Sequence, residues 1–331
     1  MSSTGMRTYI LRRLLLAVPT LVGASLVIFF MVRLIPGGVV QQIAGDNPLD
    51  TGERTRIEKD LGLDRPAYEQ YFAWAGGVVR LDFGKSLRDD SSVTARLKNT
   101  LPTTMEMAVL AIFVSVLIAV PVGVLSAIRQ DSILDYVSRS IAIGFLSFPT
   151  FWLGTMIIVF ASVWFTRATP VPQQYQQFWE NPYQNLKFLV FPFGNFVPAG
   201  PSVLLGVSLS GTVMRLMRTQ MLEVLRQDYV RTAWAKGLHE RSVIIGHAMK
   251  NAMIPVVTVV GLQVPIVVGG SVIVESIYNV PGMGQWLFQA IGLRDYTAVQ
   301  SIALLTAVAV VVSNLGVDIT YAYLDPRIRY S

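Results

Sequence analysis

The sequence predicts an all-α integral membrane protein with six transmembrane helices and both termini in the cytoplasm. Of its 331 residues, 52% are hydrophobic and 15% are charged, whereas soluble domains carry about 25% charged residues. Six uncharged runs are long enough to cross a bilayer, which takes roughly 20 apolar residues in a helix. The net charge of +6 fits basic cytoplasmic loops better than nucleic-acid binding. We therefore expect the protein to lie in a lipid bilayer and to bind no nucleic acid.

The six expected spans follow one another along the whole chain. They are Leu14–Val32, Met107–Ile128, Ser140–Thr166, Phe188–Met214, Asn251–Val274 and Tyr296–Val317. The first run could instead be a signal peptide, but "RLIPGG" follows it where a small-residue cleavage site would stand, so we interpret it as a retained span. The first half of the fourth run holds several prolines and glycines, so its helical part should begin near Ser202.

The distribution of basic residues gives the orientation. Three arginines precede the first span, which favours a cytoplasmic N-terminus. Alternation then places the segment between the fourth and fifth spans in the cytoplasm, and Arg215–Lys250 carries seven basic residues against three acidic ones. The chain thus divides into a tail with the first span (1–35), an extracytoplasmic segment (36–103) and a five-span core (104–331) with a cytoplasmic loop at 219–252.

The extracytoplasmic segment is predicted to form two short amphipathic helices. The first is indicated near Ile57–Leu63, and the second is rich in aromatic residues, which suit a membrane interface. Two interpretations stay open. The segment is either a solvated loop whose helices pack on the mouth of the bundle, or a docking surface for an external partner with Tyr68, Tyr71 and Trp74 as candidates.

The sequence offers no nucleotide site, metal site or catalytic centre. "GKS" at Gly84–Ser86 does not fit a phosphate-binding loop, because Val79 stands where that motif needs a glycine. His239 and His247 lie in the cytoplasmic loop at a spacing unlike HExxH, and there is no cysteine, so no metal site is expected. The serines within the spans have no histidine or lysine at membrane depth to activate them, so we do not expect an enzyme.

The spans hold few ionisable groups and several helix-breaking residues. Those ionisable groups sit near span ends, which argues against a proton-driven carrier: Arg33, Glu106, Glu275 and Asp318. Proline removes a backbone hydrogen bond, and glycine allows helices to approach closely. Ordinary membrane packing would account for such residues, but we favour a bundle that rearranges around a cavity. The gating and kink candidates are Pro121, Pro149, Pro255, Gly261 and Pro265.

A short charged helix is predicted between the fourth and fifth spans, in "DYVRTAWAKGLHERSVIIGHAMKNAMIP". Asp228 is expected to be its N-cap, and Tyr229–Lys236 shows helical spacing. Gly237 then stands where a left-handed residue ends many helices. A second helical pattern, roughly Arg241–Met253, leads into the fifth span. A helix of two turns is marginal alone, so we interpret it as a rigid knob offered to a cytoplasmic partner.

At these residues the sequence resembles a known family. "YVRTAWAKG" followed by "HAMKNAMIP" is similar to the EAA loop of inner-membrane permeases of ABC importers, and is closest to the branch for dipeptides, oligopeptides and nickel. The family's Glu-Ala-Ala positions read Arg231, Thr232 and Ala233 here. Gly237 matches the family glycine, and Pro255 closes the pattern several residues late. The absent glutamate and the longer spacing are typical of the peptide branch.

Three further stretches resemble the same branch in the same order. They are "YILRRLLLAVPTLVGASLVIFFMVRLIPG", "LGLDRPAYEQYFAWAGGVVRLDFGKSL" and "ESIYNVPGMGQWLFQAI". The resemblance therefore covers almost the whole chain. It implies the fold of a type I ABC importer permease and a place in the inner (cytoplasmic) membrane.

The resemblance also implies partners. These are a second homologous permease subunit, commonly a different chain, two ATP-binding subunits and an extracytoplasmic solute-binding protein. ATP and Mg would be used by the ATPase partners, and this chain would bind no cofactor. The short helix would be the coupling helix. Its expected ATPase-coupling residues are Tyr229, Arg231, Ala233, Lys236, Gly237, Leu238, Glu240 and Arg241.

Short peptides, from dipeptides to oligopeptides, are the expected cargo. The same architecture could carry nickel, glutathione or short oligosaccharides instead, although no histidine or cysteine lies in an expected span to select nickel. A secondary transporter is the remaining alternative. It would need ionisable groups inside the membrane or a filter sequence, and the sequence shows neither.

Overall fold

The structure is a computed structural model that describes residues 3–34, 52, 55, 64–164, 175–191 and 199–324. Within these residues the chain is helical and contains no strand, and Lys85 and Ser92 form an isolated antiparallel bridge. The first amphipathic helix expected outside the membrane, near Ile57–Leu63, lies outside the described residues.

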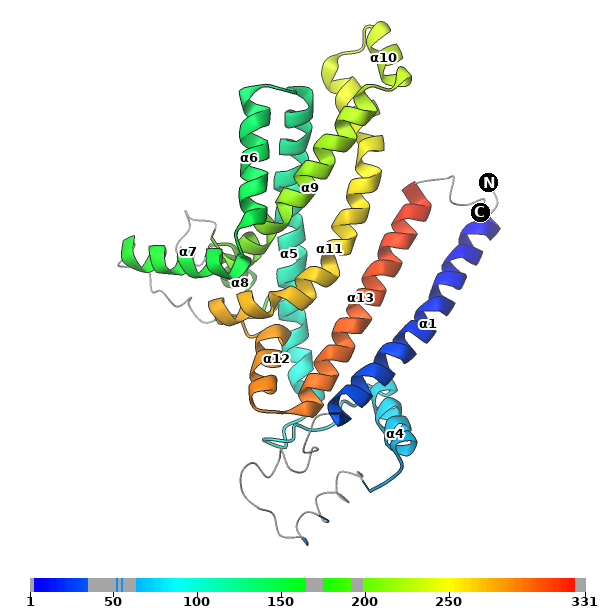
Figure 1. Cartoon of the computed structure of the whole chain (residues 1–331), viewed down its shortest axis with the longest axis vertical. Coiled ribbons are helices and arrows are strands. Elements are labelled where there is room, and N and C mark those ends of the chain that lie inside the picture. Colours follow the sequence, from blue (N-terminus) through cyan, green and yellow to red (C-terminus); the bar gives the residue numbers. More distant parts are fainter. Residues whose placement is uncertain are drawn as a thin grey trace.

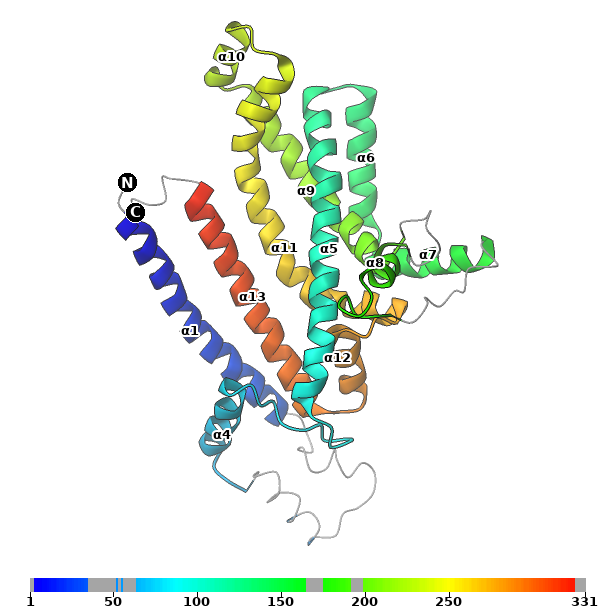
Figure 2. The same cartoon turned by 180° about the vertical axis from the view of Figure 1, so that it is seen from behind.

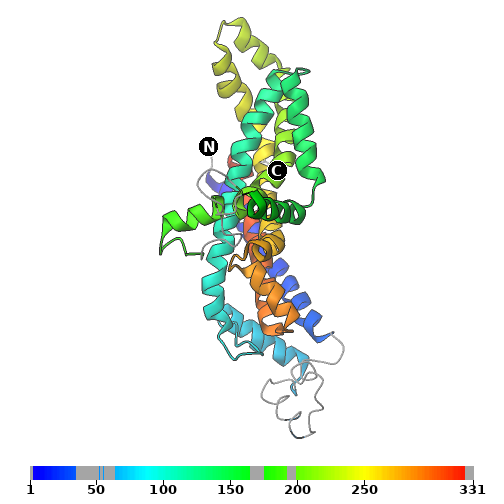
Figure 3. The same cartoon turned by 90° about the vertical axis from the view of Figure 1, so that its left-hand side faces the viewer.

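Long helices running side by side make the body of the described structure (Figures 1 and 2). They are α1 (Ser3–Arg33), α5 (Val93–Ile128), α9 (Pro201–Leu225), α11 (Met249–Tyr278) and α13 (Tyr296–Leu324). α1 packs on α13, α13 packs on α11, and α11 packs on both α5 and α9. The bundle is broad in Figure 1 and narrow in the side view of Figure 3.

The two ends of the bundle carry different short helices. α10 (Asp228–Ala235) lies at one end, and α4 (Ala67–Val79) lies toward the other with α12 (Met283–Gly292). The first residues of α1 and the last residues of α13 lie in the half that carries α10 (Figure 1). This arrangement agrees with the predicted orientation, in which the termini and the loop 219–252 share one side of the membrane.

Four described helices are long and apolar enough to cross a membrane, and a bent pair brings the number to five if it counts as one span. The four are Ile10–Arg33, Val93–Ile128, Ser242–Gly269 and Tyr296–Thr320, and they overlap the first, second, fifth and sixth expected spans. α9 begins at Pro201, beside the start expected near Ser202. α8 (Pro182–Val190) is a separate short helix before it.

The third expected span differs from the single helix that its composition indicates. It is divided into α6 (Ile133–Ser147) and α7 (Thr150–Trp164), which are bent by 97° relative to each other. Phe148 joins them with an extended backbone, at φ −92° and ψ 131°. A proline clashes sterically with the residue before it when that residue has α-helical backbone angles, so the preceding residue favours an extended conformation. Pro149 therefore marks a full break in the helix rather than a gentle kink.

Small residues bring α5 and α9 into close contact. A Cβ atom added to Gly206 would lie 2.6 Å from the backbone oxygen of Ala111, and one added to Gly123 would lie 2.8 Å from that of Met214. Helices in lipid associate through such close backbone approach, because apolar side chains gain little by leaving an apolar solvent. The α5–α9 pair is therefore the closely packed centre on which the neighbouring helices lie.

Glu275 holds the end of the bundle where α11 turns into α12. Its side chain is fully buried. Oε1 accepts from Thr104 Oγ1 and from Ser271 Oγ, each at 2.8 Å, and Oε2 accepts from the backbone N–H of Gln285 at 2.8 Å. Thr104 in turn accepts from the N–H of Met283 at 2.8 Å. The first-turn amides of α12 are thus capped by side chains from α11 and α5, since Gly282 at the N-cap has none.

We expect Glu275→Ala to destabilise the protein. It would leave the buried hydroxyl of Thr104 and the partly buried N–H of Gln285 without their acceptor, and each unsatisfied buried group costs about 1–3 kcal/mol. Ser271 would keep its bond to the oxygen of Val268. Glu275→Gln keeps one acceptor oxygen and should have a smaller effect. Thermal unfolding of the purified protein in detergent measures the difference, with the exposed Glu69→Ala as the control. Equal melting of the three variants would contradict the capping role.

Candidate functional site

The short helix α10 forms almost where the sequence predicts it. It covers Asp228–Ala235. Gln227 is the N-cap, with an extended backbone and no side-chain capping bond, so the expectation that Asp228 is the N-cap is wrong by one residue. Asp228 is instead an acidic residue in the first turn, where its negative charge interacts favourably with the helix dipole and stabilises α10.

Gly237 ends α10 in the left-handed conformation, at φ +75°, which confirms the predicted stop. Its N–H donates to the oxygen of Trp234 at 2.9 Å, and the N–H of Leu238 donates to the oxygen of Ala233 at 3.4 Å. No atom lies within 4 Å of the place where a Cβ would stand. A side chain at this position would therefore meet backbone strain and no steric clash.

One face of α10 is buried against the protein itself. Val230 is fully buried and Ala233 is 6% exposed, and both pack on Val243 of the π-helical segment η1 (Ser242–Ala248). The hydroxyl of Tyr229 accepts from Asn251 Nδ2 at 2.7 Å. This packing supplies the support that so short a helix needs. It also places Ala233 toward the interior, whereas the sequence predicts that Ala233 contacts a partner.

The part of α10 that is not buried and the turn after it form an exposed surface at the tip of the molecule (Figure 1). We call it the tip patch. Its apolar members, Tyr229, Trp234 and Leu238, are 42%, 44% and 39% exposed. The charged residues exposed around them are Arg231, Lys236, Glu240 and Arg241. Exposed apolar groups with a polar rim mark an interaction surface.

Trp234 is the tip-patch residue absent from the expected coupling set. Helical spacing places Tyr229, Val230, Ala233 and Trp234 on one face of α10, and the structure divides that face into a buried centre and exposed edges. An aromatic residue inside a strongly basic loop was the available signal, because tryptophan is enriched at the centres of interfaces.

An ion pair joins α6 to the helix that leads into α10. The guanidinium of Arg218 on α9 binds both carboxylate oxygens of Asp135 on α6. Its Nε donates to Oδ1 at 2.7 Å and its Nη2 donates to Oδ2 at 2.7 Å. Ser126 of α5 donates to the same carboxylate, and so does the N–H of Asp131 at 3.1 Å. Asp135 is fully buried. Three helices therefore meet at one carboxylate in the half of the bundle that carries α10.

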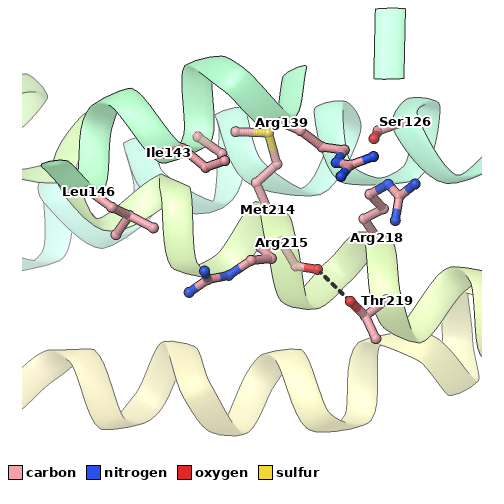
Figure 4. Close-up of a pocket in the computed structure, with 9 residues that line it drawn as sticks. Ser126, Arg139, Ile143, Leu146, Met214, Arg215, Arg218 and Thr219 are labelled. Carbon is pink, nitrogen blue, oxygen red and sulfur yellow. Dashed lines mark hydrogen bonds between the residues drawn. The ribbon is translucent and has the colours of Figure 1, made fainter. Parts of the chain in front are cut away.

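Beside this ion pair lies a cavity of about 170 Å³ between α6 and α9 (Figure 4). Arg139 from α6 and Arg215 from α9 line it together with Arg218, and Leu146 and Met214 supply apolar walls. Thr219 donates to the backbone oxygen of Arg215 at 3.0 Å, the bond drawn in Figure 4. No local pattern in the sequence indicates this arrangement, because its members lie far apart along the chain.

The kink candidates lie in different surroundings. Pro265 removes the hydrogen-bond donor that would serve the oxygen of Gly261, and Ser313 of α13 donates to that oxygen at 3.0 Å. A Cβ on Gly261 would collide with Val317, so α11 and α13 are in direct contact there. Pro121 and Pro255 lie inside the continuous helices α5 and α11. Of the five candidates, Pro149 alone stands at a break between helices.

The docking candidates outside the membrane divide into two groups. Tyr68 is exposed, at 62%. Tyr71 and Trp74 pack on Phe29 of α1, with ring centroids 5.3 and 5.6 Å from it, and the Tyr71 hydroxyl lies 2.8 Å from Ser25 Oγ. Two of the three rings therefore fasten α4 to α1, and Tyr68 alone points outward.

No three histidine, aspartate or glutamate side chains lie close enough to hold a metal ion in the described part of the chain. The tip patch is an exposed surface at one end of the helical body, and the Arg218–Asp135 ion pair and the Glu275 cap are buried polar contacts between its helices.

The family described as "Binding-protein-dependent transport system inner membrane component" matches residues 119–330, and the N-terminal part of the same kind of component matches residues 6–108. The chain belongs to this family of transport permeases. Together with the apolar helices, membership indicates a multi-pass inner-membrane protein.

The permease is similar to named proteins over nearly all of its length. It is 37% identical over 338 residues to the dipeptide transport system permease protein DppB of Escherichia coli K12, which covers 98% of this chain and 99% of that protein. It is 36% identical over 330 residues to the oligopeptide transport system permease protein AppB of Bacillus subtilis 168, covering 98% and 100%. The recognition of a peptide-branch ABC permease from the sequence is thereby confirmed.

A solved structure supports the fold. The methionine ABC transporter MetNI, in an inward-facing conformation, aligns with a TM-score of 0.54 and 19% identity over 69% of this chain and 96% of that chain. At this identity the likeness concerns the arrangement of helices alone. The all-helical fold of an ABC importer permease is the part of the fold prediction that is confirmed.

Gly237→Val should leave the permease inserted in the membrane but unable to transport. A β-branched residue resists the left-handed backbone that positions Leu238 after α10, at a cost above the 1–2 kcal/mol typical of other residues. Gly237→Asn is the matched variant, because asparagine tolerates this conformation. Membrane content by immunoblot and substrate uptake are the two measurements. Normal uptake by the valine variant would refute the role of the turn.

Arg218→Leu should destabilise the permease strongly. It leaves the carboxylate of Asp135 buried without its counter-charge, a change that costs about 3–5 kcal/mol in buried pairs. The double variant Asp135→Leu with Arg218→Leu removes both charges and should recover much of the loss. Thermal unfolding in nanodiscs tests both. A double variant no more stable than the single one would show that the pair is not the source of the effect.

Proposed function

We propose that the chain is a permease subunit of an ATP-driven importer that moves short peptides, from dipeptides to oligopeptides, across the cytoplasmic membrane. The observation that carries the cargo class is the full-length similarity to permeases named for dipeptide and oligopeptide transport. A peptide needs no metal-binding side chains along its path, and no histidine or cysteine lies in an expected span.

The assembly that we propose follows from the family. Two permease subunits, of which this chain is one and a homologous different chain is the other, form the membrane part. Six spans with both termini inside fit the described arrangement, with the α6–α7 pair and α9 as the third and fourth spans. Two ATP-binding subunits use ATP and Mg on the cytoplasmic face, and this chain binds neither. A solute-binding protein delivers cargo outside, and Tyr68 is the exposed one of the three docking candidates.

The tip patch is the proposed contact with the ATPase. Its exposed apolar residues supply the buried centre of such an interface, and Arg231, Lys236, Glu240 and Arg241 supply a charged rim that sets its register. Gly237 fixes the turn, and Ala233 acts from inside by packing α10 on η1.

Coupling then needs a bundle with two arrangements whose balance the ATPase shifts. Moving a population from 1:99 to 99:1 takes about 5.5 kcal/mol, which an interface of this kind can supply. Movement of α10 would reach the membrane along η1 into α11 and along α9 to the Arg218–Asp135 ion pair. The break at Phe148 and Pro149 is where α6 could reorient against α7.

Trp234→Asp tests the proposed contact. A carboxylate at the centre of the tip patch should weaken ATPase binding by about tenfold or more, because aromatic anchors dominate such interfaces. Trp179→Asp is the matched control, since Trp179 is 61% exposed on the loop before α8. Copurification of the ATP-binding subunits and ATP-driven uptake of a radiolabelled dipeptide are measured for both. Full ATPase recovery with Trp234→Asp, or no peptide uptake by the unmodified complex, would refute the corresponding half of the proposal.

A further inference from the structure

The cavity of about 170 Å³ between α6 and α9 carries positive charge that its own surroundings do not neutralise. Arg139, Arg215 and Arg218 line it, and no acidic residue is among its described lining residues (Figure 4). Asp135 neutralises Arg218 through both of its carboxylate oxygens. Arg139 and Arg215 form no ion pair with a described residue, and the guanidinium of Arg139 lies 5.7 Å from the neutral ring of Tyr136. Two guanidinium groups are thus open to an anion.

The charged part of the cavity lies at the inner boundary of the membrane. Arg139 directly precedes the third expected span, which begins at Ser140, and Arg215 directly follows Met214, where the fourth expected span ends. Ser126 also lines the cavity and belongs to the last turn of the second expected span. A headgroup layer borders the hydrocarbon core of a bilayer on each side. The two arginines are therefore at the depth of the headgroups of the cytoplasmic leaflet.

The remaining wall of the cavity is apolar and leads away from this boundary. Leu146 and Met214 belong to it, and Leu146 lies near the far end of α6. Leu146 also lines a neighbouring cavity of about 500 Å³ at the break between α6 and α7. Phe145 and Phe148 line that second cavity, and none of its described lining residues is charged. A cationic end is thus joined to an uncharged wall that extends into the membrane.

This combination matches an anionic phospholipid better than a peptide. A guanidinium can donate two parallel hydrogen bonds to a phosphate group, and basic pockets between membrane helices on the cytoplasmic side bind anionic headgroups. The acyl chains of the same molecule suit the apolar wall. A dipeptide would instead bring its positively charged amino group into a cavity lined by arginines and by no described acid.

We propose that this cavity binds an anionic phospholipid of the cytoplasmic leaflet, with its phosphate-bearing headgroup beside Arg139 and Arg215 and an acyl chain along Leu146. The inference goes beyond the proposed function and does not depend on the cargo. Bound there, the lipid joins α6 to α9 next to the Arg218–Asp135 ion pair, in the helix that leads into α10.

Native mass spectrometry tests the proposal on the full-length chain together with the subunits that copurify with it. The complex is stripped of lipid in detergent and titrated with dioleoylphosphatidylglycerol. Dioleoylphosphatidylcholine, which has the same chains and no net charge, is titrated in parallel. We expect phosphatidylglycerol to bind at least about tenfold more tightly. An excess of inorganic phosphate should not displace it, because free phosphate gains nothing from the apolar wall.

The double variant Arg139→Gln with Arg215→Gln tests the site itself. The dissociation constant of one phosphatidylglycerol per complex should rise about tenfold or more. Arg129→Gln with Arg226→Gln is the matched control, because both of these arginines are exposed near the same end of the bundle and neither lines the cavity. The control should bind phosphatidylglycerol as the unmodified complex does. The melting temperature of each lipid-free complex shows whether the fold is intact.

Leu146→Asp provides an independent test that leaves the arginines in place. Its side chain is 42% exposed, so the fold should tolerate the change. A carboxylate on the apolar wall would repel the phosphate and oppose the acyl chain, and phosphatidylglycerol should again bind about tenfold or more weakly.

Several results would overturn the inference. Equal affinity for the two lipids would show that charge plays no part, and unchanged affinity in the cavity variants would place the lipid elsewhere. Equal weakening in the control would indicate general attraction to a basic surface, and displacement by inorganic phosphate would indicate a free-phosphate site. Loss of the second permease subunit from the arginine variant would show that a carboxylate of that subunit fills the cavity. None of these measurements uses peptide uptake, so the proposed function is tested separately.

Discussion

Every polar backbone group inside a bilayer must find a hydrogen-bond partner within the protein, and this requirement explains the most informative features of the structure. Where Pro265 frees a carbonyl of α11, Ser313 of the neighbouring helix binds it. Where α12 begins without a capping side chain of its own, Glu275 and Thr104 bind its first amides. Phe148 and Pro149, at the break between α6 and α7, form part of the wall of a cavity of about 500 Å³. The irregular positions of this membrane body are thus the places where its helices are joined to one another.

Packing and hydrogen bonds also connect α10, at the tip of the molecule, to the helices in its interior. α10 is too short to stand alone, and its buried residues bind it to η1, a π-helical segment that continues directly into α11. Segments of π-helix are often found at functional sites. α9 arrives at α10 from the other side and carries Arg218, which fixes it to α6 and α5 through Asp135. A displacement of α10 can therefore reach the membrane-spanning helices through η1 and α11 or through α9.

Local signals in the sequence predict the local features. Apolar runs predict the long helices, and Gly237 predicts the end of α10 because only its own backbone conformation is involved. The third span differs because the restriction that Pro149 imposes on Phe148 outweighs an uninterrupted apolar composition. The burial of Ala233 depends on Val243, which is not fixed by helical spacing within α10. Arg218 with Asp135, and Glu275 with Thr104, are separated by 83 and 171 positions, so no pattern within one segment reveals these pairs.

The tip patch has a consequence for how a cell must manage this polypeptide. Three large apolar side chains lie exposed on α10 and on the turn after it, at the extremity that the proposed topology places in the cytosol. A copy synthesised in excess of its partner subunits would expose an apolar surface of the kind that chaperones and proteases bind. Balanced production of the subunits is then a requirement for the survival of this one, and overproduction should succeed when the genes are expressed together.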